Sequence, residues 1–171
     1  MDIKKILALL IIVLALFSCL GAASAGLFDF FGGEPKNQTY TFDGFTLDLP
    51  EGCQINDTNQ SSDGLNTHEY LVYFPENANG TGINVIKYTG SGLVSTVDEY
   101  VNNLATYGAK LVEKYGNWSI VDVNSFTPPA GGTNNLTGYL IITRTPDGAF
   151  VVIRGDSPEQ LKGIADTYKT V

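Results

Sequence analysis

The sequence predicts an α+β domain in which an antiparallel sheet of about six or seven strands is packed by two helices. Three observations predict this class. Short segments of alternating apolar and polar residues recur along the chain, turn sequences such as Asp43-Gly44 and Pro146-Asp147-Gly148 join them, and two stretches have helical apolar spacing. Because hairpins make neighbouring strands antiparallel, the expected order is four strands, a helix, three strands and a final helix (ββββ-α-βββ-α).

The first half of the expected domain is rich in strands. Phe45, Leu47 and Leu49 alternate with polar residues, so they are expected to face the core. The polar stretch at residues 56–66 is expected to be the longest loop. The strands predicted around it lie at residues 39–42, 45–49, 67–74 and 82–88.

The second half contains both predicted helices. A long helix is expected at residues 97–115, capped by Thr96 and ended by Gly116. Residues 157–168 form the second helix, because Ser157-Pro158-Glu159-Gln160 is a capping box with proline at the first helical position. Between them, strands are predicted at residues 118–123, 136–145 and 149–154, with a loop at residues 127–132.

The first 25 residues predict export. Lys4 and Lys5 precede an apolar run at residues 6–17, and Ala23-Ser24-Ala25 provides the small residues of a signal-peptidase site. Two alternatives remain open: Leu16-Phe17-Ser18-Cys19 resembles a lipoprotein lipobox, and the segment is just long enough to stay uncut as an anchor. The expected organisation is therefore a signal peptide or anchor (1–25), a tether (26–38) and one domain (39–171) facing outside the cell.

Charge and residue counts exclude several kinds of site. A net charge of −8 argues against nucleic-acid binding, which needs a basic surface, and favours solubility outside the cell. After cleavage Cys53 would be the single cysteine, so no disulfide could form within the domain. With His68 as the single histidine, a zinc site of four protein ligands is also excluded. His68 itself is expected to be an ordinary surface or cross-strand residue.

One segment has the oxygen-rich spacing of a calcium loop. Asp57, Asn59, Ser61 and Asp63 recur at every second position, as the ligands of an EF-hand loop do. The match then fails, because Gly64 comes two residues late and His68 stands where the bidentate glutamate belongs. An ordinary polar loop without a cofactor is therefore the main expectation, with calcium as the alternative.

Acceptor sequences for N-linked sugars are the most specific motif in the chain. A sugar at any of them would require an exported chain and a host that glycosylates. Five of the six fall in or beside predicted loops. The six asparagines are Asn37, Asn56, Asn59, Asn79, Asn117 and Asn135.

The order of these elements resembles that of PsbP-like domains. The opening Phe-Asp-Gly-Phe-Thr-Leu-Asp-Leu-Pro-Glu-Gly at residues 42–52 resembles their two short strands followed by proline and glycine, and the final strand at 150–153 leads into a short helix. The resemblance covers most of residues 40–171 and implies a docking or accessory module rather than an enzyme. The Asn- and Thr-rich composition also resembles small exported surface proteins of archaea.

These observations predict a non-catalytic module at the cell surface, secreted or tethered, that contacts an envelope protein or a glycan. Contact with the membrane is expected only through an uncleaved or lipidated N-terminus. Two alternatives remain: an extracellular hydrolase using unassigned acidic residues, and a calcium-stabilised adhesive domain. A pair of carboxylates in one pocket would favour the hydrolase, whereas an exposed aromatic patch would favour the module.

Overall fold

The computed structural model describes residues 36–62, 64–76, 78, 81–91, 93–127 and 136–171. The folded unit spans Asn37–Val171. The predicted signal peptide or anchor and nearly all of the tether lie outside the described residues. Neither helix in the described part of the chain is long and apolar enough to span a membrane.

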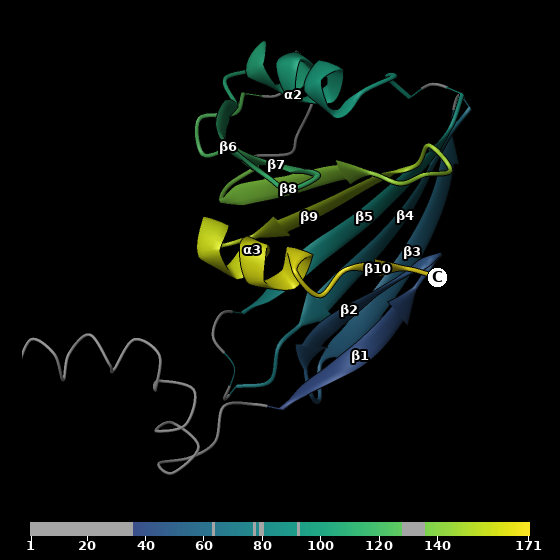
Figure 1. The fold of residues 1–171 in the computed structure, drawn as a ribbon, viewed down its shortest axis with the longest axis vertical. Coiled ribbons are helices and arrows are strands. Elements are labelled where there is room, and N and C mark those ends of the chain that lie inside the picture. Colours follow the sequence, from purple (N-terminus) through teal and green to yellow (C-terminus); the bar gives the residue numbers. More distant parts are fainter. Residues whose placement is uncertain (1–35, 63, 77, 79–80, 92, 128–135) are drawn as a thin grey trace, which may run out of the picture. The chain divides into compact units, whose positions relative to one another are not determined.

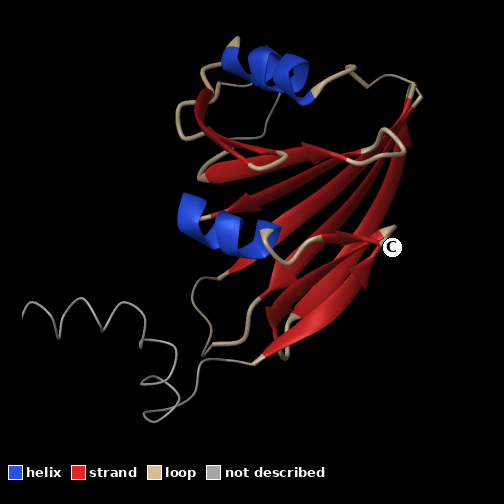
Figure 2. Cartoon of the chain, in the orientation of Figure 1, coloured by secondary structure: helices blue, strands red, loops and turns tan. Residues whose placement is uncertain are grey.

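The fold is α+β, with two helices and two antiparallel sheets (Figures 1 and 2). Every neighbouring pair of strands in the larger sheet is antiparallel. In spatial order its seven strands are β3 (Gln54–Ser62), β4 (Leu65–Tyr73), β5 (Gly82–Gly90), β9 (Phe150–Gly155), β8 (Tyr139–Arg144), β7 (Trp118–Asp122) and β6 (Lys110–Tyr115).

A small three-stranded sheet packs on one face of the large sheet. Its central strand β2 (Phe45–Pro50) pairs with β1 (Asn37–Phe42) and with β10 (Lys169–Thr170), close to the C-terminus. The Asp43-Gly44 turn joins β1 to β2 as predicted, with a positive φ of 80° at the glycine. The small sheet therefore ties the two ends of the folded unit together.

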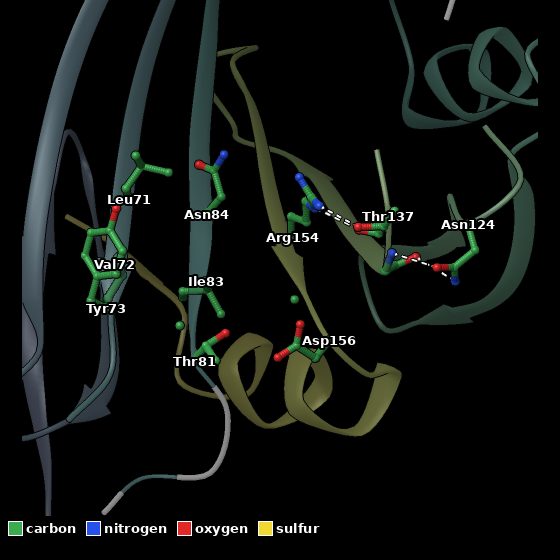
Figure 3. A pocket seen from close by; sticks show the side chains of 13 residues that line it. Leu71, Val72, Tyr73, Thr81, Ile83, Asn84, Asn124, Thr137, Arg154 and Asp156 are labelled. Carbon is green, nitrogen blue, oxygen red and sulfur yellow. Dashed lines mark hydrogen bonds between the residues drawn. The ribbon is translucent and has the colours of Figure 1, made fainter. Parts of the chain in front are cut away.

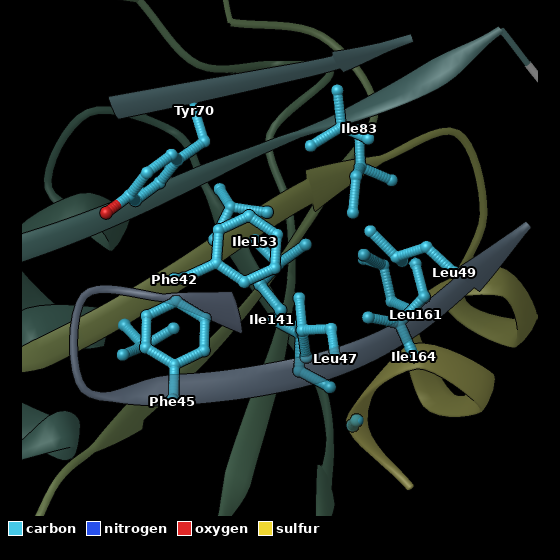
Figure 4. Packing of buried hydrophobic residues seen from close by; sticks show 14 of the residues in the cluster. Phe42, Phe45, Leu47, Leu49, Tyr70, Ile83, Ile141, Ile153, Leu161 and Ile164 are labelled. Carbon is cyan, nitrogen blue, oxygen red and sulfur yellow. The ribbon is translucent and has the colours of Figure 1, made fainter. Parts of the chain in front are cut away.

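Two apolar clusters hold the layers on opposite faces of the large sheet. In the first, Phe45, Leu47 and Leu49 of β2 are fully buried against Ile141 and Ile153 (Figure 4). Helix α3 (Pro158–Ala165) closes this cluster with its own buried leucine and isoleucine. Helix α2 (Val97–Ala105) covers the second cluster, which contains the alternate residues of β8 and β9. Successive side chains of each central strand point to opposite faces of the sheet, so each of these strands contributes residues to both clusters.

The strand and helix order differs from the expected one at α2. The helix begins after Thr96, as predicted, but it ends at Ala105, and residues 110–115 form β6 instead of two more helical turns. Gly108 explains the break: its φ is 96°, and a Cβ there would lie 2.4 Å from the carbonyl oxygen of Ser125. The observed order is five strands, a helix, four strands, a helix and a short strand.

The prediction of a loop at residues 56–66 is also wrong. Residues 54–62 form β3 and pair with β4 in an unbroken register, with Gly64 at the turn. As an edge strand, β3 has a single hydrogen-bonded neighbour among the described strands, β4. The described side chains of β3 are mostly exposed on both faces of the sheet. Such a strand needs few apolar residues, so its polar sequence does not distinguish it from a loop.

Candidate functional site

Half of one face of the large sheet is left uncovered by the helices. Helix α2 packs mainly on β6, β7 and β8, and it also reaches Tyr88 of β5. Among the described residues, nothing covers the same face of β3, of most of β4 and of the Asn84 end of β5. The register places Asn56, Leu71, Asn84 and Arg154 side by side across four strands on this face. Leu71 is 38% exposed there, so this row is accessible to a ligand.

A hollow among the described residues lies on this open face. Its volume is about 470 Å³, within the range of small-molecule sites. Both its floor and its rim carry polar groups (Figure 3). We call it the open-face cavity, and the side chains that give it its chemistry are Leu71, Tyr73, Asn84, Asn124, Arg154 and Asp156.

Arg154 is the cationic group of the open-face cavity. Its Nε donates to the carbonyl oxygen of Thr137 at 2.8 Å, and its Nη2 donates to Thr137 Oγ1 at 2.9 Å. These two bonds hold the guanidinium plane, while another of its nitrogens lies on the side of Asn84 (Figure 3). No carboxylate of the described residues forms an ion pair with it. The free edge of the guanidinium can therefore donate to a ligand.

Asn84 forms part of the cavity floor. Its Nδ2 donates to Glu69 Oε1 at 2.7 Å, which sets the orientation of the amide because only the NH₂ group can donate to a carboxylate. Its Oδ1 is buried and has no hydrogen-bond partner among the described residues. An unsatisfied buried acceptor costs about 1–3 kcal/mol. Because this oxygen has no exposed surface, Asn84 forms part of the floor without presenting the oxygen to the cavity.

The rim of the cavity combines an aromatic ring with fixed polar groups. Tyr73, at the end of β4, is 50% exposed, and Asp156, just after β9, is exposed. Asn124 is held from two sides, since its Oδ1 accepts from the Gly138 N–H at 3.0 Å and its Nδ2 donates to Asp122 Oδ1 at 2.8 Å. Hydrogen bonds from the Asn124 backbone and side chain lower the pKa of Asp122. This network orders the rim before any ligand arrives.

A second polar cluster lies on the opposite face, beside the small sheet. The Nδ1 of His68 lies 2.9 Å from the hydroxyl of Tyr70, and its Nε2 lies 3.4 Å from Asp57 Oδ2. The nearly buried Lys87 pairs with Asp43 Oδ2 at 3.1 Å and donates to the Asp43 carbonyl at 2.9 Å. Burial is the main cause that raises the pKa of Tyr70. These contacts fasten the β1–β2 turn to the large sheet, a structural role.

The segment for which calcium was the alternative to an ordinary polar loop forms strand β3. Asp57, Asn59 and Ser61 occupy alternate positions of β3, so their side chains follow one another at about 7 Å along a strand. They do not surround one point, as EF-hand ligands do. Asp63 lies outside the described residues, and among those described no group of three or more metal-binding side chains is found.

The predicted sugar acceptors are exposed wherever they are described. Asn37 lies on β1 and Asn117 on the β6–β7 turn. Asn56 and Asn59 lie on β3, so the expected loop position is wrong for these two. Asn79 and Asn135 fall outside the described residues. Glycosylation itself stays a prediction.

The open-face cavity was missed because its residues share no sequence motif. Tyr73, Asn84 and Arg154 belong to three different strands and meet only through the pairing of β4, β5 and β9. One signal was present in the sequence: Arg154 follows Phe150 and Val152 at alternate positions, on the face where these two are buried. A charged residue at that position indicates that the elements packed over Phe150 and Val152 do not extend over Arg154.

No family model, no curated protein and no solved structure matches the chain. The PsbP-like resemblance therefore stays a prediction based on element order.

Proposed function

We propose that Asn37–Val171 is a non-catalytic binding module that holds a glycan on the uncovered half of its large sheet. The observation that carries the proposal is the open-face cavity, whose lining includes an exposed tyrosine, a positioned guanidinium, amides and a carboxylate. Sugar hydroxyls both donate and accept hydrogen bonds, so they suit a site that offers both kinds of partner. Tyr73 adds a flat apolar surface for the C–H face of a sugar ring.

Charge and polarity favour a glycan over other ligands. Arg154 would donate to hydroxyl or carboxylate oxygens, while the exposed carboxylate of Asp156 would accept from hydroxyl groups. A purely apolar ligand would leave these groups without partners. The predicted export would place the module among surface glycans, secreted or tethered with the domain outside the cell.

The experiment is binding of the full chain to a panel of immobilised surface polysaccharides. We expect Arg154→Gln and Tyr73→Ala to weaken binding at least about tenfold, which corresponds to about 1.4 kcal/mol, the size of one hydrogen bond to a charged group. Tyr107→Ala is the matched control, because Tyr107 is also exposed but does not line the cavity. Equal binding by all four proteins, or no bound polysaccharide, would contradict the proposal.

The other predicted functions have less support from the geometry. A hydrolase would need two carboxylates facing one bond, and Asp156 is the one carboxylate among the described residues that line the cavity. An envelope-protein partner would bind the same open face, and Tyr73→Ala would abolish its binding as well. Free polysaccharide would not displace such a protein. That competition separates the two kinds of partner.

A further inference from the structure

The two edges of the large sheet differ in how they are protected. At one edge, β6 contains a register shift between Leu111 and Glu113 and carries Lys110 and Lys114. Bulges and lysines are common devices that stop a strand edge from pairing with another chain. At the other edge, β3 pairs with β4 over nine residues without a shift and contains neither lysine nor proline. In the part of the chain that the structure describes, the β3 edge is therefore open to another strand.

The backbone groups that β3 offers follow from the hydrogen bonds of β4. The Ser91 N–H donates to the Gly64 carbonyl and the Phe74 N–H to the Thr81 carbonyl, so even-numbered groups along β4 face β5. Odd-numbered groups of β4 then face β3, where their partners are even-numbered. The residues of β3 whose N–H and C=O point to the open edge are therefore Ile55, Asp57, Asn59 and Ser61.

We propose that β3 pairs antiparallel with β3 of a second copy of this chain, with Thr58 on the two-fold axis. Thr58 is the middle residue of β3, so this register pairs the whole strand and brings together the four outward-facing residues of each copy. Asp57 then lies opposite Asn59 of the second copy, where the carboxylate can accept from the amide. A register centred on Asp57 would instead place two carboxylates opposite each other, which is unfavourable.

This pairing has a consequence that rests on the proposed function. Paired residues of two antiparallel strands point to the same face, so the two-fold axis is perpendicular to the sheet. Both open-face cavities then lie on one side of a continuous sheet. Two linked sites on one side bind a repetitive polymer more tightly than either site alone. The dimer itself, however, follows from β3 alone and can be tested without any glycan.

Cysteine cross-linking in the full chain tests the register. At the axis the two Thr58 Cα atoms would form a non-hydrogen-bonded pair about 4.5 Å apart, within disulfide range. Gln60→Cys is the matched control, because it lies on the same strand and face but about 14 Å from its own copy. Under mild oxidation we expect Thr58→Cys to form a covalent dimer and Gln60→Cys to stay monomeric. The unmodified chain gives the background from its own thiols.

A proline substitution tests whether the edge hydrogen bonds hold the dimer. Asn59→Pro removes an N–H that faces the open edge, so β3 keeps its bonds to β4. Asn59→Ala keeps that N–H, and both changes remove the same sugar acceptor. In the Thr58→Cys background, we expect Asn59→Pro to abolish the cross-link and Asn59→Ala to preserve it.

Three results would overturn the proposal. They are equal cross-linking of Thr58→Cys and Gln60→Cys, a cross-link that survives Asn59→Pro, and a sugar located on Asn56 or Asn59 by peptide mapping of the native chain. A sugar on either residue would occupy the edge that the second copy needs. Loss of the dimer with polysaccharide binding unchanged would leave the proposed function intact, so the two proposals fail separately.

Discussion

Truncation of Phe45 tests whether the small sheet belongs to the same cooperative unit as the large one. Phe45 is fully buried in β2, and its ring stacks between Phe42 at 5.1 Å and Tyr168 at 5.4 Å between centroids. Strand β2 pairs only with β1 and β10 among the described strands. The two sheets are therefore joined mainly by side-chain packing, and Phe45 lies at the centre of that packing.

The expected cost of Phe45→Ala follows from its complete burial. Replacing a buried phenylalanine by alanine lowers the free energy of unfolding by about 3–5 kcal/mol, through lost burial and the cavity left behind. For a domain of this size, each kcal/mol lowers the melting temperature by about 3–4 °C, so the midpoint should fall by about 10–20 °C. A single transition should remain, because both sheets share one apolar cluster.

Urea and thermal unfolding followed by circular dichroism measure this change. Leu111→Ala is the control, because Leu111 also lies on a strand but is 47% exposed on the edge strand β6. Its free energy of unfolding should change by less than about 0.5 kcal/mol. If Phe45→Ala costs less than about 1.5 kcal/mol, or unfolds in two separated steps, then the small sheet is an independent appendage and the reasoning is wrong.

Three further predictions concern the backbone, pH and calcium. Gly108→Ala should lower the free energy of unfolding by about 1–3 kcal/mol or more, because the φ of Gly108 is positive and the Ser125 carbonyl blocks a Cβ there. Gly163→Ala in α3 should raise the free energy of unfolding by about 0.5–1 kcal/mol, because a Cβ there meets no atom within 4 Å and alanine favours a helix. Urea unfolding measures both changes. Burial raises the pKa of Tyr100 in the folded protein, so folding favours the neutral phenol. The stability from this preference is complete below about pH 10 and is lost as the pH rises further. In thermal melts at increasing pH, Tyr100→Phe should reduce the fall of the melting temperature above that pH. Millimolar calcium should leave the melting temperature unchanged in both wild type and Asp57→Ala, and a shift that the substitution removes would instead support the calcium alternative.

Local chemistry allowed the capped ends and the central strands to be predicted. Thr96 Oγ1 accepts from the Glu99 N–H at 3.1 Å, and Ser157 Oγ accepts from the Gln160 N–H at 3.2 Å, so both predicted N-caps are confirmed. The alternation at 45–49 is also confirmed, because its odd-numbered residues are fully buried. These features depend on residues close together in the chain, and a single sequence contains that information.

The missed elements depend on contacts that are distant in the chain. The apolar spacing at residues 97–115 fits a helix throughout, and the approach of Ser125 to Gly108 decides where the helix ends. Strand β3 is specified by its pairing with β4 rather than by its own composition. In both places tertiary contacts override a local pattern, which is the usual limit of propensity arguments.

The candidate site could not be predicted from local sequence for the same reason. It lies where helix α2 no longer covers one face of the large sheet, and that position depends on contacts that are distant in the chain. Along β9, Phe150 and Val152 are buried beneath α2, and Arg154, the next residue on that face, is polar and half-buried. Across the strands, the same face passes from the apolar cluster under α2 to Asn84 on β5 and Asn56 on β3. The chemistry of the face therefore changes where the cover of α2 ends. The proposed binding function would give the guanidinium of Arg154 a partner on this face, since none of the described carboxylates forms an ion pair with it.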